Sequence, residues 1–144
     1  MDRVVVEDWR SYPLGTRGIP SDWKGQTWGK PTYDLEIVAD DGRPSLRLRS
    51  RGDSSMIIRD LGASIDLKET PVLQWSWKVM TLPAGGHACQ KSKDDEAAQV
   101  YVAWLRPPES VRSRIIGYVW DSTAPRGTIC KSEKLSTVTY IVLR

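Results

Sequence analysis

The carboxylates of the segment KSKDDEAA, residues 91–98, are the side chains best suited to do chemistry. Asp94 and Asp95 stand next to Glu96 in this segment, and Asp121 follows a later apolar stretch. Carboxylate oxygens are the ligands that Ca²⁺ prefers, and two carboxyl groups about 5 to 9.5 Å apart can cleave a glycosidic bond. Consecutive carboxylates seldom converge, however, and an EF-hand spacing is missing. We therefore expect a solvated turn here, and we keep Asp94, Asp95 and Asp121 as candidate binding residues without a catalytic role.

His87 and the two cysteines are the other candidates. His87 could act as a general base for Cys89 or a nearby serine, but the sequence shows no third residue to orient it and no nucleophile elbow. Glycine motifs that bind phosphate are missing as well. With a single histidine beside them, Cys89 and Cys130 make a poor set of metal ligands. The sequence thus predicts a protein that is not an enzyme and that uses no metal or cofactor.

Cys89 and Cys130 each lie in a polar segment, HACQKSKDDE and TICKSEK. A disulfide can form if these two loops meet. A reducing compartment would keep both thiols free instead. The sequence leaves both states open.

Residues 69–86, ETPVLQWSWKVMTLPAGG, are the stretch around which the expected elements are arranged. Apolar and polar side chains alternate over residues 72–80 with the period of a β-strand. Trp75 and Trp77 share one face, where two indoles form an apolar slab that a second layer of structure must cover. This pattern predicts a two-layer β protein with both tryptophans near its centre.

Other short segments of strand composition are separated by turn residues, among them Asp41-Gly42, a typical hairpin turn. Gly117 indicates a bulge or a close backbone approach within an apolar strand. The only helical turn is expected within residues 91–98. Strands at this spacing favour an all-β fold, an antiparallel β-sandwich that forms a single domain over residues 1–144. The expected strands cover residues 4–9, 33–38, 45–49, 54–61, 63–67, 72–80, 99–105, 115–120 and 136–144.

The aromatic residues are seven Trp and five Tyr with no Phe, so nearly every large ring carries a polar atom that needs a partner. Tyr12, Trp23 and Trp28 lie in a long loop, residues 11–31, which contains four Gly and three Pro. These rings either cover the rim of the core or form flat platforms for a ligand.

The net charge of +3 arises from 21 basic and 18 acidic residues that are mostly interspersed. The one basic stretch, residues 43–51, is expected to be a half-buried strand with a solvated basic face. Nucleic-acid binding would need more basic side chains and a reading element, so we expect none. No apolar run is long enough for a transmembrane segment. Met1 is not followed by a secretion signal, which favours the cytoplasm unless a leader lies outside this sequence.

The segments ETPVLQWSWKVMTLPAGG, KSKDDEAAQVYVAWL and IIGYVWDSTAPRGT resemble a bacterial family, domain of unknown function 3047. The resemblance extends over most of the chain, from VVVEDWRSYPLGTRGIPSDWKG onward. It implies a jelly-roll-like β-sandwich similar to carbohydrate-binding modules, with no established activity and no catalytic residue. Members of that family commonly look exported. They also continue past the position of Ile141, so the resemblance implies that this chain lacks the family's C-terminal segment.

The final segment STVTYIVLR, residues 136–144, is apolar on both sides. It is therefore either a central strand or an edge that another molecule completes. Together with the missing closing segment, it favours a non-catalytic protein-interaction module, an accessory or structural subunit of a larger assembly. The alternative is a carbohydrate-binding module with Tyr12, Trp23 and Trp28 as platforms. We thus expect a protein partner, with a glycan ligand as the alternative.

Overall fold

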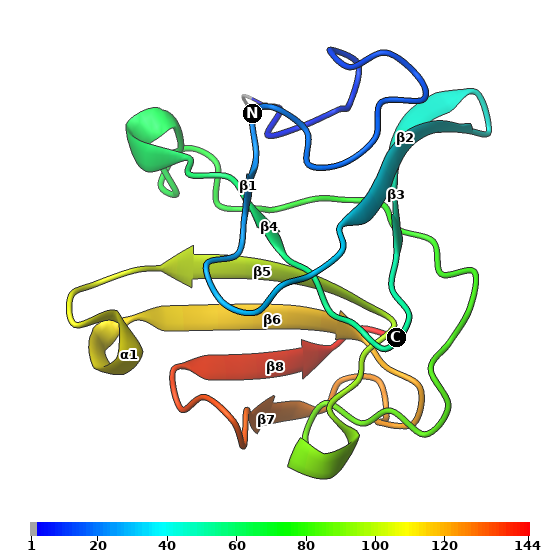
Figure 1. The fold of residues 1–144 in the computed structure, drawn as a ribbon. Helices are drawn as coiled ribbons and strands as arrows, with labels where there is room; N and C mark the ends of the chain where they lie inside the picture. Colours follow the sequence, from blue (N-terminus) through cyan, green and yellow to red (C-terminus); the bar gives the residue numbers. More distant parts are fainter. Residues whose placement is uncertain (1–2) are drawn as a thin grey trace. The chain divides into compact units, whose positions relative to one another are not determined.

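The computed structural model describes residues 3–144 and divides into two compact units, Met1–Gln74 and Trp75–Arg144. The regular structure of the described residues is almost entirely β-strand; the exceptions are helix α1 (Glu109–Arg112) and the 3-10 turns η1 (Gly62–Ser64) and η2 (Lys91–Lys93) (Figure 1). The predicted all-β class with antiparallel sheets is confirmed, and the single sandwich domain stays a prediction. The strands are β1 (Lys24–Gly25), β2 (Asp34–Asp40), β3 (Arg43–Arg49), β4 (Ile57–Ile58), β5 (Ala98–Trp104), β6 (Arg114–Trp120), β7 (Ile129–Lys131) and β8 (Val138–Val142).

Strands β2 and β3 of the first unit form an antiparallel hairpin around Asp41 and Gly42. Both turn residues have positive φ, 52° and 74°, as a type I′ turn requires. The period-2 alternation of β2 puts Leu35 and Ile37 on the same side, and each is only 1% exposed. The hairpin that the Asp-Gly turn predicts is therefore confirmed.

The strand predicted for residues 4–9 does not form. Oε2 of Glu7 accepts hydrogen bonds from the backbone amides of Asp8 and Trp9, each at 3.1 Å. These two donors are then not available to a neighbouring strand. Trp9 also has a φ of 62°, which ends the extended course of the chain. The strand prediction is wrong here because a local side-chain acceptor replaces the ladder.

The two strands predicted over residues 54–61 and 63–67 are reduced to β4, a two-residue strand that pairs with β1. Oδ1 of Asp60 accepts the backbone amide of Gly62 at 2.9 Å, and the turn η1 follows. Gly62 lies between the two predicted strands, and its φ of 51° fits a turn at this position. An aspartate turn therefore interrupts the segment, and the longer strands were wrongly predicted.

The second unit contains a four-stranded sheet with the order β5-β6-β8-β7, and its strands lie side by side in Figure 1. β6 is antiparallel to β5 and parallel to β8, and β7 is antiparallel to β8. The parallel pair departs from the fully antiparallel prediction, because residues 121–137 are a connection long enough for a crossover. β8 has neighbours on both sides. Of the two alternatives for the apolar C-terminal segment, the central strand is therefore correct.

One face of this sheet carries the buried core of the second unit. Gly117 in β6 lies between the rings of Tyr101 and Tyr140. A Cβ on Gly117 would come within 2.6 Å of Tyr101 Cε1 and 3.0 Å of Tyr140 Cδ1, so the predicted close backbone approach is confirmed. The buried apolar residues of this core are Ala88, Val119, Ala124, Val138, Tyr140 and Val142.

Residues 72–80 are not a strand of any sheet, although their alternation is present. Trp75 and Trp77 are partly buried, and the residues that alternate with them are exposed. The Trp75 ring lies 5.4 Å from that of Tyr118, and the Trp77 ring 5.8 Å from that of Trp120. The segment was wrongly predicted as a paired strand because its indoles contact ring side chains of β6 while its backbone joins no sheet edge. The shared apolar face of the two tryptophans is confirmed.

Candidate functional site

Two of the three predicted ring platforms belong to a packed cluster in the first unit. Trp23 stacks on Trp9, with ring centroids 5.5 Å apart and 24° between the planes, and its Nε1 donates to Glu7 Oε1 at 2.9 Å. The Tyr12 ring lies 6.4 Å from that of Trp9, and its hydroxyl accepts a hydrogen bond from the Asp22 amide at 3.2 Å. We call Glu7, Trp9, Tyr12 and Trp23 the N-terminal aromatic cluster.

The charge in this cluster has a partner. The Glu7 side chain is only 10% exposed, and Arg59 Nη1 lies 3.5 Å from its Oε1. Arg59 Nη1 also donates to the carbonyl oxygen of Val6. Glu7 thus accepts hydrogen bonds from an indole and two backbone amides and faces a guanidinium group. A network whose hydrogen-bonding groups all have partners stabilises a fold, and few of these groups are available to bind a ligand.

Trp28, the third predicted platform, is exposed over 56% of its surface. Its carbonyl oxygen accepts a hydrogen bond from Gln26 Nε2 at 2.9 Å, so the backbone beside the ring is tied down. Trp28 is the one predicted platform that offers its ring to solvent.

The predicted carboxylates of the second unit have different surroundings. Asp121 is 6% exposed, and both of its oxygens accept backbone amides, Oδ2 from Ala88 at 2.7 Å and Oδ1 from Ser122 at 2.6 Å. Asp95 is exposed, and its carbonyl oxygen lies where a Cβ on Gly86 would come within 2.1 Å. Asp121 therefore anchors the loop around Ala88, and only the Asp95 carboxylate faces solvent.

Asp94 forms a pair with Glu96, a residue that the sequence did not identify as a titrating group. The Asp94 side chain is 7% exposed, its Oδ2 lies 3.4 Å from Lys134 Nζ, and it accepts a hydrogen bond from the Tyr140 hydroxyl at 3.5 Å. Glu96 Oε2 accepts from Gln99 Nε2 at 2.6 Å, whereas its buried Oε1 receives no hydrogen bond. Burial and the neighbouring Asp94 raise the pKa of Glu96 to about 8. Glu96 is therefore largely protonated at neutral pH and can donate toward Asp94.

The buried Tyr140 and the partly buried Tyr101 complete these surroundings. Burial raises the pKa of Tyr101 and, less strongly, that of Tyr140. The Tyr101 hydroxyl donates to Gln99 Oε1, the amide that also contacts Glu96. Both phenols therefore remain neutral donors at physiological pH.

Residues 3–144 contain no group of three or more His, Cys, Asp and Glu side chains that could hold a metal ion. The same residues include no helix with the length and apolar character needed to cross a membrane.

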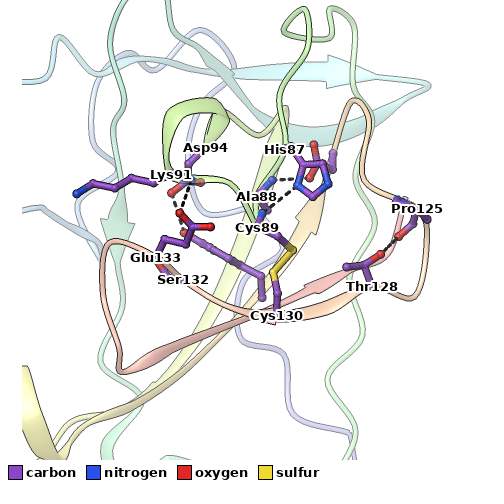
Figure 2. The surroundings of a disulfide bond; sticks show 12 residues. His87, Ala88, Cys89, Lys91, Asp94, Pro125, Thr128, Cys130, Ser132 and Glu133 are labelled. Carbon is purple, nitrogen blue, oxygen red and sulfur yellow. Dashed lines mark hydrogen bonds between the residues drawn. A yellow bond between two sulfur atoms is a disulfide. The ribbon is translucent and has the colours of Figure 1, made fainter.

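Cys89 and Cys130 form a disulfide that joins the loop before η2 to strand β7 (Figure 2). Their Cα atoms are 5.8 Å apart, and 41 residues separate them along the chain. The Lys91 amide donates to Glu133 Oε2 at 3.2 Å, which ties the same two regions a second time. His87 Nδ1 accepts the Cys89 amide at 3.2 Å. In the chain-entropy model, closing a loop of this length stabilises the fold by about 4 kcal/mol, so the Cys89–Cys130 disulfide has a structural role.

A pocket of about 410 Å³ lies where β5 connects to β6 and is lined by Trp104, Arg106, Arg112 and Arg114. We call the pocket lined by these four residues the arginine pocket. Trp104 and Arg114 are opposite each other in the strand register, and Trp104 is 44% exposed. Sequence reasoning missed this site. The signal was the segment WLRPPESVRSR, residues 104–114, which combines one tryptophan and three arginines with a single acidic residue.

Backbone carbonyls position two of the guanidinium groups. Arg112 Nη1 donates to the Pro107 carbonyl at 3.3 Å, and Arg114 Nη1 donates to the Ser113 carbonyl at 3.1 Å. Ser113 is 1% exposed, and its Oγ accepts the Arg106 amide at 3.1 Å. The buried Ser113 therefore holds both ends of the connection that carries the pocket.

The comparison with known families gives one match, a model described as a protein of unknown function (DUF3047), which covers residues 21–144. No curated protein and no solved structure matches the chain. The matched range includes both cysteines, the carboxylates around Glu96 and the whole arginine pocket. The chain therefore belongs to the DUF3047 family, as the resemblance of its motifs implied.

Proposed function

We propose that this chain is a non-catalytic protein-interaction module, an accessory or structural subunit of a larger assembly. The supporting observation is the exposed surface of residues 104–114 in the second unit. Trp104, Leu105 and Val111 are 44%, 59% and 69% exposed beside the three arginines. Tryptophan and arginine contribute most of the binding energy at protein interfaces, where weaker apolar contacts surround them. This composition fits the centre of a docking surface.

The apolar C-terminal strand does not support the proposal, because β8 is an inner strand. The edge strand β5 supports it, since its last residue is Trp104. The docking surface is thus the end of an edge strand and the connection that follows it.

A non-catalytic role agrees with the surroundings of the candidate reactive groups. Cys89 is held in a disulfide, and one ring nitrogen of His87 accepts a backbone amide. Both oxygens of Asp121 accept backbone amides. These contacts occupy the groups that a nucleophile, a base or a paired carboxylate would need.

Site-specific photo-cross-linking during purification from the source tests the docking surface. A photoreactive amino acid replaces Val111 in one sample and Ile129, which is 68% exposed on β7, in a matched sample. We expect position 111 to cross-link a stoichiometric partner and position 129 to cross-link it much less. Trp104→Ala should abolish the cross-link from position 111. A monodisperse monomer that forms no cross-link at either position would contradict the proposal.

A carbohydrate-binding module is the second candidate, and the exposed Trp28 ring is the observation in its favour. Trp28→Ala should then abolish retention on a glycan array without changing the melting temperature. Trp23→Ala is not an equivalent test, because Trp23 stacks on Trp9 and binds Glu7. Absence of retention across a broad set of glycans would argue against this candidate.

A further inference from the structure

We infer that the arginine pocket binds carboxylate side chains of an acidic, apolar segment of the partner protein. This inference rests on the proposed function and specifies the chemistry of the partner at the same surface.

The hydrogen-bonding character of the pocket is one-sided. Its four lining side chains are one indole and three guanidinium groups. These groups donate hydrogen bonds and cannot accept them. The complementary ligand group is therefore an oxyanion, and a carboxylate matches the planar fork of arginine with two parallel hydrogen bonds.

The three positive charges have no carboxylate partner within residues 3–144. Arg106, Arg112 and Arg114 take part in none of the ion pairs observed among these residues, such as those of Arg10, Arg17, Arg47, Arg59 and Lys134. Like charges gathered around one pocket repel one another, and a bound anion would remove this repulsion. The N-terminal aromatic cluster, in contrast, supplies its own counter-charge in Glu7.

Two of the three guanidinium groups are held in place before a ligand arrives. Arg112 and Arg114 each spend one N–H on a backbone carbonyl, at 3.3 Å and 3.1 Å. A guanidinium group has five N–H donors, so each retains several for a ligand. Groups that are already positioned lose less conformational entropy on binding.

The exposed apolar residues of this segment favour a peptide over a sugar. Leu105 and Val111, next in sequence to Arg106 and Arg112 of the pocket, are 59% and 69% exposed. Exposed apolar side chains beside the arginines suit leucine or valine in a partner segment. A sugar ring presents many hydroxyl donors, and the pocket offers no side-chain acceptor for them. An acidic segment with interspersed apolar residues therefore fits better than an acidic polysaccharide.

The test measures binding of a fluorescein-labelled peptide of alternating Glu and Leu to the full chain, with a Gln-and-Leu peptide as the neutral control. The site variant is the triple change Arg106→Gln, Arg112→Gln and Arg114→Gln. A matched variant changes Arg43, Arg49 and Arg51 to Gln, three exposed arginines of the first unit, and lowers the net charge equally. We expect the Kd for the Glu peptide to rise at least tenfold in the site variant and less than twofold in the matched variant. The neutral peptide should not bind.

Three results would overturn the inference. An equal loss of affinity for the Glu peptide in the two triple variants would show that the peptide is attracted by net charge alone and not by the pocket. Binding of the Gln peptide as tight as that of the Glu peptide would show that carboxylates are not recognised. Binding of polygalacturonate, with no binding of the Glu peptide, would assign the pocket to an acidic polysaccharide.

A second measurement covers the case of a triple variant that does not fold. The indole N–H signals of the wild-type chain are recorded in ¹H–¹⁵N spectra. The single change Trp104→Ala identifies the signal of Trp104, because this signal is absent from the variant. Addition of the Glu peptide should shift the signal absent from Trp104→Ala and leave the Trp28 signal in place. A protein partner cross-linked from position 111 with no effect of the Glu peptide would refute the inference but leave the proposed function intact.

Discussion

The N-terminal aromatic cluster and the arginine pocket are built from the same kinds of side chain, tryptophan beside charged groups. In the cluster, Trp23 lies on Trp9 and donates to Glu7, and Arg59 faces the same carboxylate. In the pocket, Trp104 stands beside three arginines with no carboxylate partner among the described residues.

The polar groups of the cluster have partners within the chain, whereas the arginines of the pocket have no carboxylate partner among the described residues. This difference separates a structural role from the binding role that we propose. Each buried polar atom of the cluster has a hydrogen-bond partner, so these hydrogen bonds stabilise the folded state. The pocket residues are also exposed, which supports the binding role that we propose. The same residue types therefore stabilise the first unit and, in our proposal, bind a ligand in the second.

The largest effect should come from Trp23→Ala, which removes the stack on Trp9 and the hydrogen bond to Glu7. Burial of Trp23 is partial, so we expect the free energy of unfolding to fall by about 3 kcal/mol, near the lower end for Trp to Ala changes. Urea denaturation followed by far-UV circular dichroism measures it. Trp28→Ala, at an exposed ring, serves as the control and should change the value by less than about 0.5 kcal/mol. Equal losses in the two variants would mean that Trp23 is no part of a structural cluster.

A pH-dependent effect should come next, from Glu96. The pKa of this group rises from 4.5 to about 8 on folding, mainly because the carboxyl is buried and then because Asp94 is close. The folded state thus binds more protons than the unfolded state between these values, and stability falls as pH rises through this window. Below pH 4.5 the contribution of protonated Glu96 is complete.

Thermal melts from pH 5 to pH 8.5 measure the effect of Glu96. We expect the melting temperature of Glu96→Gln to fall less over this range than that of the wild type, because glutamine keeps a neutral group in the same place. Glu69→Gln, at an exposed carboxyl, is the control and should follow the wild type. Parallel curves for Glu96→Gln and the wild type would show that Glu96 ionises without cost in the folded chain.

Glu7→Gln should have a smaller effect, because glutamine still offers Trp23 an acceptor oxygen. The change removes the negative charge that faces Arg59, whose side chain is 32% exposed, and it replaces the oxygen that accepts the Asp8 and Trp9 amides with an NH2 group. We expect a loss of about 1 kcal/mol, typical of a partly buried ion pair. A double-mutant cycle with Arg59→Gln measures the coupling energy between Glu7 and Arg59. A coupling energy near zero would mean that the rings alone stabilise the cluster.

The smallest stability effect should come from Trp104→Ala. The ring is 44% exposed and has no stacking partner among the described rings, so the free energy of unfolding should change by less than about 0.5 kcal/mol. Urea denaturation, run beside the peptide-binding assay, compares the two consequences of one substitution. If Trp104→Ala lowered the free energy of unfolding as much as Trp23→Ala, then Trp104 would have a structural role like that of Trp23, contrary to our expectation.

The sequence by itself determined the elements whose cause is local. The β2–β3 hairpin follows from alternation and from Asp41-Gly42, where both residues need positive φ. Gly117 indicated a close approach, and Tyr101 and Tyr140 do lie against it. The segment that is now β8 was recognisable as a strand that is apolar on both sides, although the sequence left open whether it is a central strand or an edge. In the hairpin the signal and the structure lie within a few residues of one another, whereas the partners of Gly117 and of β8 come from other strands.

Tertiary structure decided what depends on partners far along the chain. Alternation at residues 72–80 could not show that Trp75 and Trp77 would contact Tyr118 and Trp120 instead of joining a sheet edge. Nor could it show that Cys89 would meet Cys130. The pKa of Glu96 depends on burial, and the arginine pocket depends on the register that sets Trp104 opposite Arg114. Burial arises only when distant segments pack together, and the register of β5 and β6 arises only when these two strands pair, so composition alone does not encode either of them.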